Sequence, residues 1–365
     1  MGRVLVAVGV CASVLCGACA GDPAIKRWSD EWLARERAGQ RGEPGAAEAL
    51  ADSAQDALTP ADVDLARFGQ ARALRAEGRT SESFALFTEL GNSSMRRIDR
   101  SRARYETARM AEAAGRRAEA VRIFRRVVQT YPNQAAAMQS LRHLEHIAAD
   151  EGPLAEADAL RWSRRAYRKL ARTPVGDDLA FMAAATVYRW WRETGREVLA
   201  ERAESLLLAV EKDHVASGHW DDAVWMLSHL YHRQGRYREE VRALGRIYAT
   251  REDAVLVGHY DTTYHWVGRL RTGRLQLLLL DDPVAAADTY ASFVSTFVWS
   301  RWRDDARFWQ GCALLRAGDA AGAEEAFGEI AGLYADSKYL ARLDAARAEP
   351  FSAVCEPKDF EEGSW

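Results

Sequence analysis

The chain has 365 residues, 48% of them hydrophobic, and a formal net charge of −3 at pH 7. These values are typical of a water-soluble protein, and they exclude a global electrostatic attraction to nucleic acid or to an anionic membrane. The length allows either two average domains or one long repeat protein.

Residues 1–18 form a predicted secretory signal peptide. One Arg precedes an apolar run that ends in small residues, and the run is too short for a transmembrane helix with a stop-transfer flank. The sequence Cys16-Gly17-Ala18-Cys19 resembles the bacterial lipobox, although Cys16 stands where Leu is usual. The resemblance implies a lipid on Cys19 and, because Asp is absent at residue 20, an outer-membrane location facing the periplasm. The alternative is cleavage after Ala18 or Ala20 to a protein without a lipid.

Residues 19–63 are predicted to be a lipidated N-terminal tether with short helices. Asp22–Ala38 places Trp28 and Trp32 on one face of an amphipathic helix. A linker rich in Gly and Pro separates it from a second helical segment, Ala46–Leu58.

Four windows further along the chain repeat one pattern when they are aligned on a turn glycine. These glycines are Gly78, Gly115, Gly235 and Gly318. The eighth residue of each window is small: Ala71, Ala108, Ser228 and Gly311. The twenty-fourth is large and apolar: Phe87, Phe124, Leu244 and Phe327. Small residues let two helices approach, and glycine takes a left-handed C-cap at low cost. The pattern therefore predicts helical hairpins of about 34 residues, which need neighbouring hairpins to cover their apolar faces.

Looser helical hairpins fill the gaps between these windows. They are predicted over Gln134–Ala149 with Pro153–Ala171, Asp177–Thr194 with Glu197–Lys212, and Asp261–Leu280 with Pro283–Phe297. We therefore expect about seven hairpins in a superhelix over residues 64–349, ending in a capping helix at Ser337–Ala348. No strands are expected, and residues 350–365 form a short acidic tail.

The four windows resemble tetratricopeptide repeats, and Tyr131-Pro132 closes one window as in that family. With the signal and the lipobox, they are similar to the bacterial outer-membrane tetratricopeptide lipoproteins, including the one in the barrel-assembly machinery. The resemblance implies an all-α, right-handed α-solenoid. It also implies a non-enzymatic scaffold that binds peptides or envelope proteins in outer-membrane assembly or cell-wall organisation. Because Asp305–Gly311 resembles the superhelical part of soluble lytic transglycosylases, a peptidoglycan-associated accessory protein without a catalytic domain is the alternative.

Residues that could carry out chemistry are sparse in this sequence. It contains no Gly-rich phosphate loop, no G-x-S-x-G and no H-E-x-x-H. His143 and His146, like His229 and His232, are spaced three residues apart on predicted helices, but neither pair has a third ligand at metal-binding spacing. We therefore expect no catalytic residue, no metal site and no cofactor.

Two cysteines, Cys312 and Cys355, remain beside the anchor once the leader is removed. An export compartment permits disulfides, so a bridge between the two is one alternative. Because one lies on the last repeat and the other in the tail, we expect two separate thiols, one of them packed.

The predicted binding surface is the concave face that, by analogy with tetratricopeptide repeats, the first helix of each hairpin lines. The residues expected on its exposed side are Phe68, Arg72, Arg75, Arg102, Tyr105, Arg109, Trp225, His229, His232, Arg233, Phe308 and Arg316. Because Arg pairs with carboxylates and aromatic rings hold apolar groups, we expect an envelope protein or extended acidic peptide as partner, and no nucleic acid. The alternative is that these arginines are solvated or pair with acidic residues of neighbouring helices.

Overall fold

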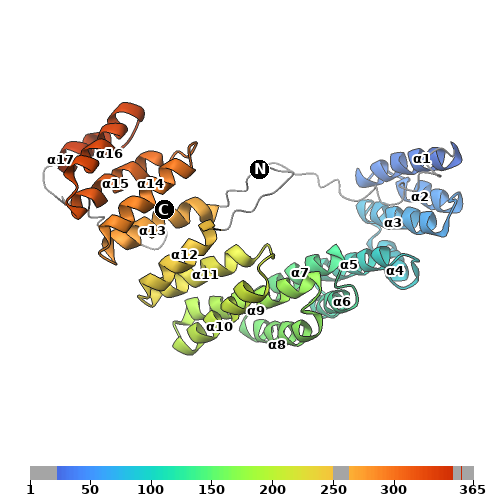
Figure 1. The fold of residues 1–365 in the computed structure, drawn as a ribbon. Coiled ribbons are helices and arrows are strands. Elements are labelled where there is room, and N and C mark those ends of the chain that lie inside the picture. Colours follow the sequence, from blue (N-terminus) through green and yellow to red (C-terminus); the bar gives the residue numbers. More distant parts are fainter. Residues whose placement is uncertain (1–22, 250–262, 348–354, 356–365) are drawn as a thin grey trace. The chain divides into compact units, whose positions relative to one another are not determined.

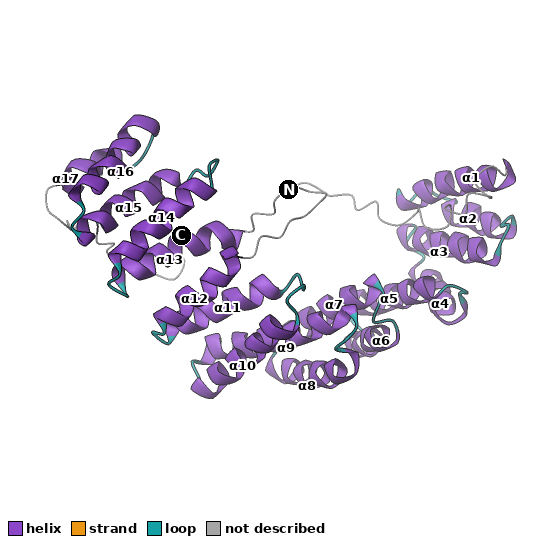
Figure 2. Cartoon of the chain, viewed as in Figure 1, coloured by secondary structure: helices purple, strands orange, loops and turns teal. Residues whose placement is uncertain are grey.

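The computed structural model describes residues 23–249, 263–347 and 355. Within these residues every regular element is a helix and no strand occurs (Figures 1 and 2). The all-α solenoid fold predicted from the sequence is therefore confirmed. The predicted signal peptide, Cys19 and the acidic tail other than Cys355 lie outside the described residues.

The helices follow one another with short connections. In chain order they are α1 (Pro23–Gln40), α2 (Ala46–Gln55), α3 (Pro60–Ala76), α4 (Thr80–Ser93), α5 (Arg97–Ala113), α6 (Arg117–Thr130), α7 (Ala135–Glu151), α8 (Pro153–Leu170), α9 (Pro174–Thr194), α10 (Glu197–Asp213), α11 (Trp220–Arg233), α12 (Tyr237–Ala249), α13 (Thr263–Leu278), α14 (Pro283–Thr296), α15 (Arg303–Ala317), α16 (Ala320–Leu333), the 3-10 turn η1 (Leu340–Arg342) and α17 (Leu343–Arg347). The chain divides into two compact units, residues 1–182 and 183–365, and α9 crosses the boundary.

Helical hairpins build each unit, as the repeat pattern predicts. The first unit contains the hairpins α3–α4, α5–α6 and α7–α8, and the second contains α11–α12, α13–α14 and α15–α16. The looser hairpins predicted between the windows begin and end within a few residues of the observed helices. Residues 261 and 262, where the third of them was expected to begin, lie outside the described residues.

The aligned columns of the repeat form the contacts within each hairpin. All four turn glycines have positive φ, for example 83° at Gly318, whose backbone N–H donates to the Leu315 carbonyl at the end of α15. The large apolar residues of the twenty-fourth column are fully buried. At Gly311 a Cβ would lie 2.3 Å from the ring of Phe327, so the absence of a side chain there lets the two helices of the last hairpin touch. The repeat register read from the sequence is therefore that of the structure.

The two helices expected in the tether, α1 and α2, pack against the first hairpin. Trp32 of α1 and Leu50 of α2 are buried with Ala66 and Leu74 of α3. The indole N–H of Trp28 also donates to the carbonyl of Ser53 at 3.0 Å. This part of the predicted tether thus covers an apolar face of α3 that would otherwise be exposed to water.

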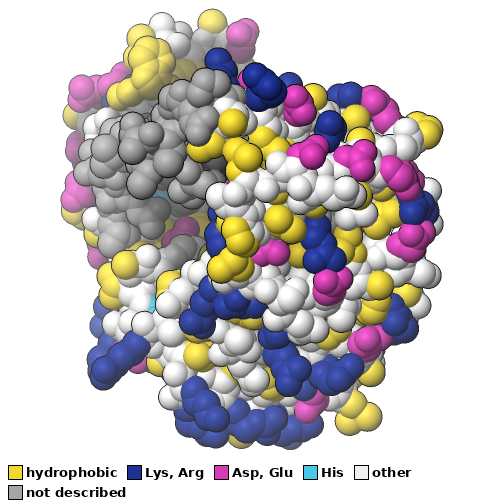
Figure 3. Space-filling model, turned by 90° about the vertical axis from the view of Figure 1, so that its right-hand side faces the viewer, with side chains coloured by type: hydrophobic (Ala, Val, Ile, Leu, Met, Phe, Trp, Pro, Cys, Tyr) yellow, Lys and Arg dark blue, Asp and Glu magenta, His cyan; other side chains and the backbone are white. Residues whose placement is uncertain are grey.

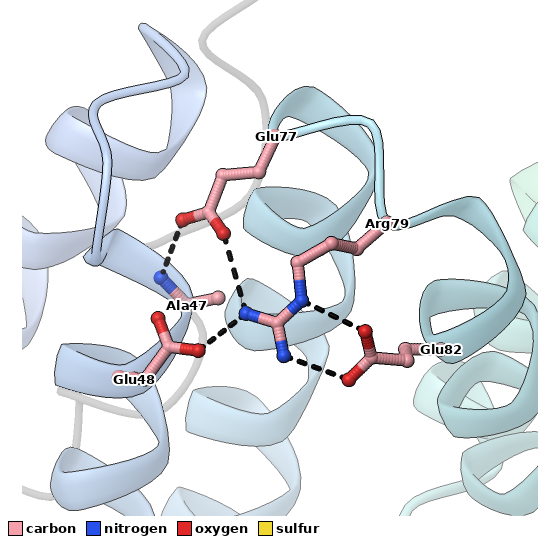
Figure 4. A network of polar contacts seen from close by, with 5 residues as sticks. All are labelled: Ala47, Glu48, Glu77, Arg79 and Glu82. Atoms are coloured by element: carbon pink, nitrogen blue, oxygen red, sulfur yellow. Dashed lines mark hydrogen bonds and ion pairs between the residues drawn. The ribbon is translucent and has the colours of Figure 1, made fainter.

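An arginine directly after a turn glycine joins neighbouring hairpins, a feature that the sequence analysis did not use. Arg79 donates through Nε and Nη2 to Glu82 on α4, at 2.8 and 2.7 Å, and through Nη1 to Glu48 on α2 (Figure 4). Arg236 does the same in the second unit, with both Nη atoms on Glu204 of α10, at 2.8 and 3.0 Å. Each arginine therefore fixes a hairpin turn to the preceding second helix.

A disulfide between Cys312 and Cys355 closes the C-terminal end of the second unit. The expectation of two separate thiols is therefore wrong. Both residues are completely buried, in a cluster with Tyr339 and Leu343. Cys355 helps to cover the apolar surface that α15 presents at the end of the last hairpin. Where a longer capping helix was expected, the described residues form only the short η1 and α17.

No helix in the described parts of the chain is long and apolar enough to cross a membrane.

Candidate functional site

The twelve residues predicted to line a groove lie on α3, α5, α11 and α15, the first helices of four hairpins. We call the surface that these helices and α7 and α13 present the first-helix face, in each unit separately. The side chains on it have different surroundings in the two units.

In the first unit the inner arginines of this face are paired with carboxylates of neighbouring helices. Arg72 Nη1 donates to Glu36 Oε1 of α1 at 2.9 Å, and Arg75 Nη1 donates to Glu106 Oε2 of α5 at 2.6 Å. The two carboxylates are only 10% and 16% exposed. Much of the positive charge predicted for this groove is therefore neutralised within the protein, which agrees with the alternative given above.

Phe68 was expected on the exposed side of α3, and this expectation is wrong. The side chain is buried and its ring meets the ring of Phe87 edge to face, with centroids 5.1 Å apart. The reason is that the second helix of the same hairpin, α4, lies against this position. What remains exposed there is Arg102 of α5, whose guanidinium lies 5.0 Å from the centre of the Phe68 ring.

Tyr105 and Arg109 of α5 border a polar contact with α7. The Tyr105 hydroxyl lies 3.1 Å from Nε2 of His143, and the other ring nitrogen of that histidine lies 2.7 Å from Glu112. Burial raises the pKa of the Tyr105 hydroxyl. Arg109 is exposed and lies over the Tyr105 ring. His143, considered above only as half of a metal-binding pair, thus joins two first helices.

In the second unit the first-helix face carries an aromatic cluster. Trp225 of α11 stacks on Tyr264 of α13, with centroids 4.8 Å apart, and also contacts His229. The Tyr264 hydroxyl donates to the carboxylate of Asp222 at 2.9 Å. The ring of His219, with Nδ1 3.8 Å from that carboxylate, and the Tyr264 hydroxyl lower the pKa of Asp222. This part of the face is therefore aromatic and carries the acidic Asp222, whereas the groove was predicted to be basic and aromatic.

His232 belongs to a buried charge cluster beneath this face. Its Nδ1 lies 2.8 Å from Glu240 Oε2 of α12, and Arg271 Nε of α13 donates to the other oxygen of Glu240 at 2.5 Å. Glu240 is completely buried and Arg271 is 2% exposed, so the two charges compensate each other out of contact with water. The cluster links two successive hairpins, which indicates a structural role for His232.

The remaining predicted residues differ in exposure. Arg233 is exposed and its guanidinium lies over the ring of Trp191. Arg316 donates to the Leu277 carbonyl at 3.1 Å and pairs with Asp281 at 2.9 Å. Phe308 was expected to be exposed, and this is wrong.

Phe308 is completely buried because the chain end folds over it. Its ring stacks on that of Tyr339, with centroids 4.1 Å apart. The Phe308 ring also lies 6.0 Å from that of Phe327 on the second helix, as Phe68 at the equivalent position meets Phe87.

A second surface of the first unit, formed by the second helices α6 and α8, is strongly basic and was missed. We call it the α6–α8 basic face, and it consists of Arg122, Arg125, Arg126, Arg161, Arg165 and Arg168. A hollow of about 530 Å³ lies between the two helices, lined by three of these arginines and by Trp162. In Figure 3 Lys and Arg side chains gather along the lower edge of the face drawn. The spacing of three and four residues between the arginines was readable in the sequence.

Among the described residues there is no group of three or more His, Cys, Asp or Glu that could hold a metal ion.

A family model described as tetratricopeptide repeat matches residues 102–133 and 305–337. These segments are the hairpins α5–α6 and α15–α16. No curated protein matches the chain.

Solved structures of repeat proteins are similar at low identity. Tetratricopeptide-like repeats of a putative kinesin light chain from Podospora anserina are 14% identical, with 67% of this chain and 99% of that chain covered and a TM-score of 0.33. The human IFIT1 dimer with PPP-AAAA is 12% identical, with coverages of 80% and 73% and a TM-score of 0.33. The tetratricopeptide domain of P58(IPK) is 16% identical, with coverages of 89% and 87% and a TM-score of 0.24. These similarities are too low to indicate a function. The two matched hairpins and the helical architecture together identify this chain as an all-α solenoid that contains tetratricopeptide repeats.

Proposed function

We propose that the protein is a non-enzymatic interaction scaffold of the bacterial cell envelope, which binds an envelope protein or an extended acidic peptide. The observation that carries the proposal is the repetition of helical hairpins, two of which match tetratricopeptide repeats. Stacked repeats of this kind create extended surfaces on which partner proteins bind, and each hairpin adds its own exposed side chains to the surface.

We also propose that a lipid on Cys19 holds the protein on the outer membrane, facing the periplasm. The lipobox-like sequence at residues 16–19 supports this location. The disulfide between Cys312 and Cys355 supports export independently, because such bonds persist in oxidising compartments and are rare in the cytosol.

The anchor is tested by the substitution Cys19→Ala. We expect the wild-type protein in the membrane fraction and the variant in the soluble periplasmic fraction, because stable anchoring requires the acyl chains that the cysteine carries. The measurement is fractionation followed by immunoblotting, and Cys312→Ala is the control that should remain with the membranes. A Cys19→Ala protein that still sediments with membranes would refute the lipid assignment.

The scaffold role is tested by affinity capture of the intact protein from solubilised envelopes, followed by mass spectrometry. We expect one or more envelope proteins to be captured, and to be released as the salt concentration rises, because charge pairs at exposed surfaces are screened. Purified sacculi serve as the comparison. Co-sedimentation with sacculi and no captured protein would contradict the scaffold role and favour the peptidoglycan-associated alternative.

A further inference from the structure

Among the residues that the structure describes, exposed arginines without an acidic partner gather on the second helices of the first unit. On the first-helix face Arg72 and Arg75 are bound to Glu36 and Glu106. On the α6–α8 basic face, in contrast, exposed arginines such as Arg122 have no acidic partner within the described part of the chain. An anionic partner therefore finds a cluster of exposed arginines on the second-helix side.

The arginines of this face form two stripes along the helices. On α8, Asp158, Arg161, Arg165 and Arg168 are spaced by three, four and three residues, which places them on one side of the helix. On α6, Arg122, Arg125 or Arg126, and Gln129 repeat the same spacing and line the hollow between the helices.

One carboxylate, Asp158, already shows how this face binds acidic groups. Arg125 Nη2 donates to Asp158 Oδ2 at 2.6 Å, and Arg161 lies 3.5 Å from its other oxygen. Arg125 is also the main cause of the lowered pKa of Asp158. The guanidinium of Arg125 lies over the ring of Trp162 and is held in place by it.

We propose that the α6–α8 basic face is the docking surface for an extended acidic segment of a partner protein. The inference rests on the proposed scaffold function and assigns it a location and a partner chemistry. Side chains on one side of an extended segment recur about every 6.5–7 Å, close to one helical turn, so successive carboxylates can reach successive arginines of a stripe. Each arginine offers a fork of donors that matches a carboxylate.

Two features of the hollow favour a polypeptide over other anions. Its aromatic floor, Trp162, is 5% exposed and covered by Arg125, so it offers no free ring on which a nucleic-acid base could stack. The hollow also recedes between the helices and is wide enough for side chains, whereas a lipid headgroup layer would meet only its rim.

The test compares two variants of the full chain that carry the same change in charge. One carries Arg122→Glu, Arg126→Glu and Arg165→Glu on the α6–α8 basic face. The matched control carries Arg102→Glu, Arg109→Glu and Arg142→Glu, which are exposed residues of the first-helix face of the same unit. Both are titrated against a fluorescent peptide of alternating Glu and Ser, with binding followed by anisotropy. If a charge-reversed variant has a lower melting temperature than wild type, the same three arginines are replaced by Gln instead of Glu.

We expect the α6–α8 variant to raise the Kd of the peptide by on the order of tenfold or more, and the control to change it less than about twofold. Equal losses in both variants, or a loss in the control alone, would overturn the inference. So would strong binding of phosphatidylglycerol vesicles or of oligonucleotide by a protein that does not bind the peptide.

Failure of this inference and failure of the scaffold function give different results. If the α6–α8 variant still captures the same envelope protein as wild type, the location is wrong and the scaffold function stands. If wild type captures no envelope protein, the scaffold function itself is wrong.

Discussion

Replacing Glu240 by Ala should lower the free energy of unfolding of the second unit by about 3–5 kcal/mol, since removing one partner of a buried ion pair leaves the other charge uncompensated. Glu240 is completely buried and accepts from Arg271, which is 2% exposed. The substitution removes the carboxylate to which Arg271 donates and the contact to His232. The measurement is urea denaturation followed by circular dichroism and tryptophan fluorescence.

The neighbouring Glu239 provides a control for this prediction. It lies one residue earlier on α12 and makes an ion pair with Arg236 at the surface, so Glu239→Ala should change stability little. A second variant, Glu240→Ala with Arg271→Met, removes both charges and should recover much of the loss, because a well-packed apolar pair avoids the desolvation cost. If Glu240→Ala unfolds at the same urea concentration as Glu239→Ala, the buried pair does not stabilise the unit.

Loss of the disulfide should cost the second unit about 4 kcal/mol, from the chain entropy that a closed loop removes from the unfolded state. The two cysteines are separated by 43 residues in the sequence, so the loop is long. We expect Cys312→Ser and Cys355→Ser to lower the melting temperature by similar amounts. The measurement is thermal unfolding with and without reductant.

Reductant should destabilise wild type and leave both variants unchanged. This comparison separates the effect of the bond from the effect of replacing a buried sulfur. Two free thiols from Cys312 and Cys355 in unfolded wild-type protein purified from solubilised membranes, counted with a thiol reagent, would contradict the pairing.

The repeat register could be predicted because its determinants are local. The small residue, the turn glycine and the large apolar residue of a window lie within one hairpin, so their spacing is visible in the sequence. The spacing predicted a close approach of the two helices at Gly311, and in the structure a Cβ there would lie 2.3 Å from the Phe327 ring.

Contacts that depend on a chain end could not be predicted in the same way. The stacking of Tyr339 on Phe308 and the pairing of Cys312 with Cys355 both involve residues that follow the last hairpin, where the repeat pattern gives no information. Likewise, the packing of α1 against α3 depends on an uncovered apolar face rather than on a repeated motif.

The location of free charge was missed for a different reason. By analogy with tetratricopeptide repeats, the predicted binding residues were all placed on first helices. The carboxylate that pairs with Arg72 there, that of Glu36, lies far from Arg72 in the sequence. Their pairing is a tertiary effect. The arginine stripes on α6 and α8 were present in the sequence as a periodic pattern, but the second helices were read only for their apolar residues.

The arginines that follow the turn glycines have a consequence for how each unit bends. Arg79 and Arg236 hold the angle between one hairpin and the helix before it by ion pairs at the surface, while the apolar columns hold the helices within a hairpin. Surface ion pairs weaken as ionic strength rises, whereas apolar packing does not. The curvature of a stack of hairpins can therefore respond to the salt around it, or change by substitution of a single surface residue, while every hairpin keeps its own core.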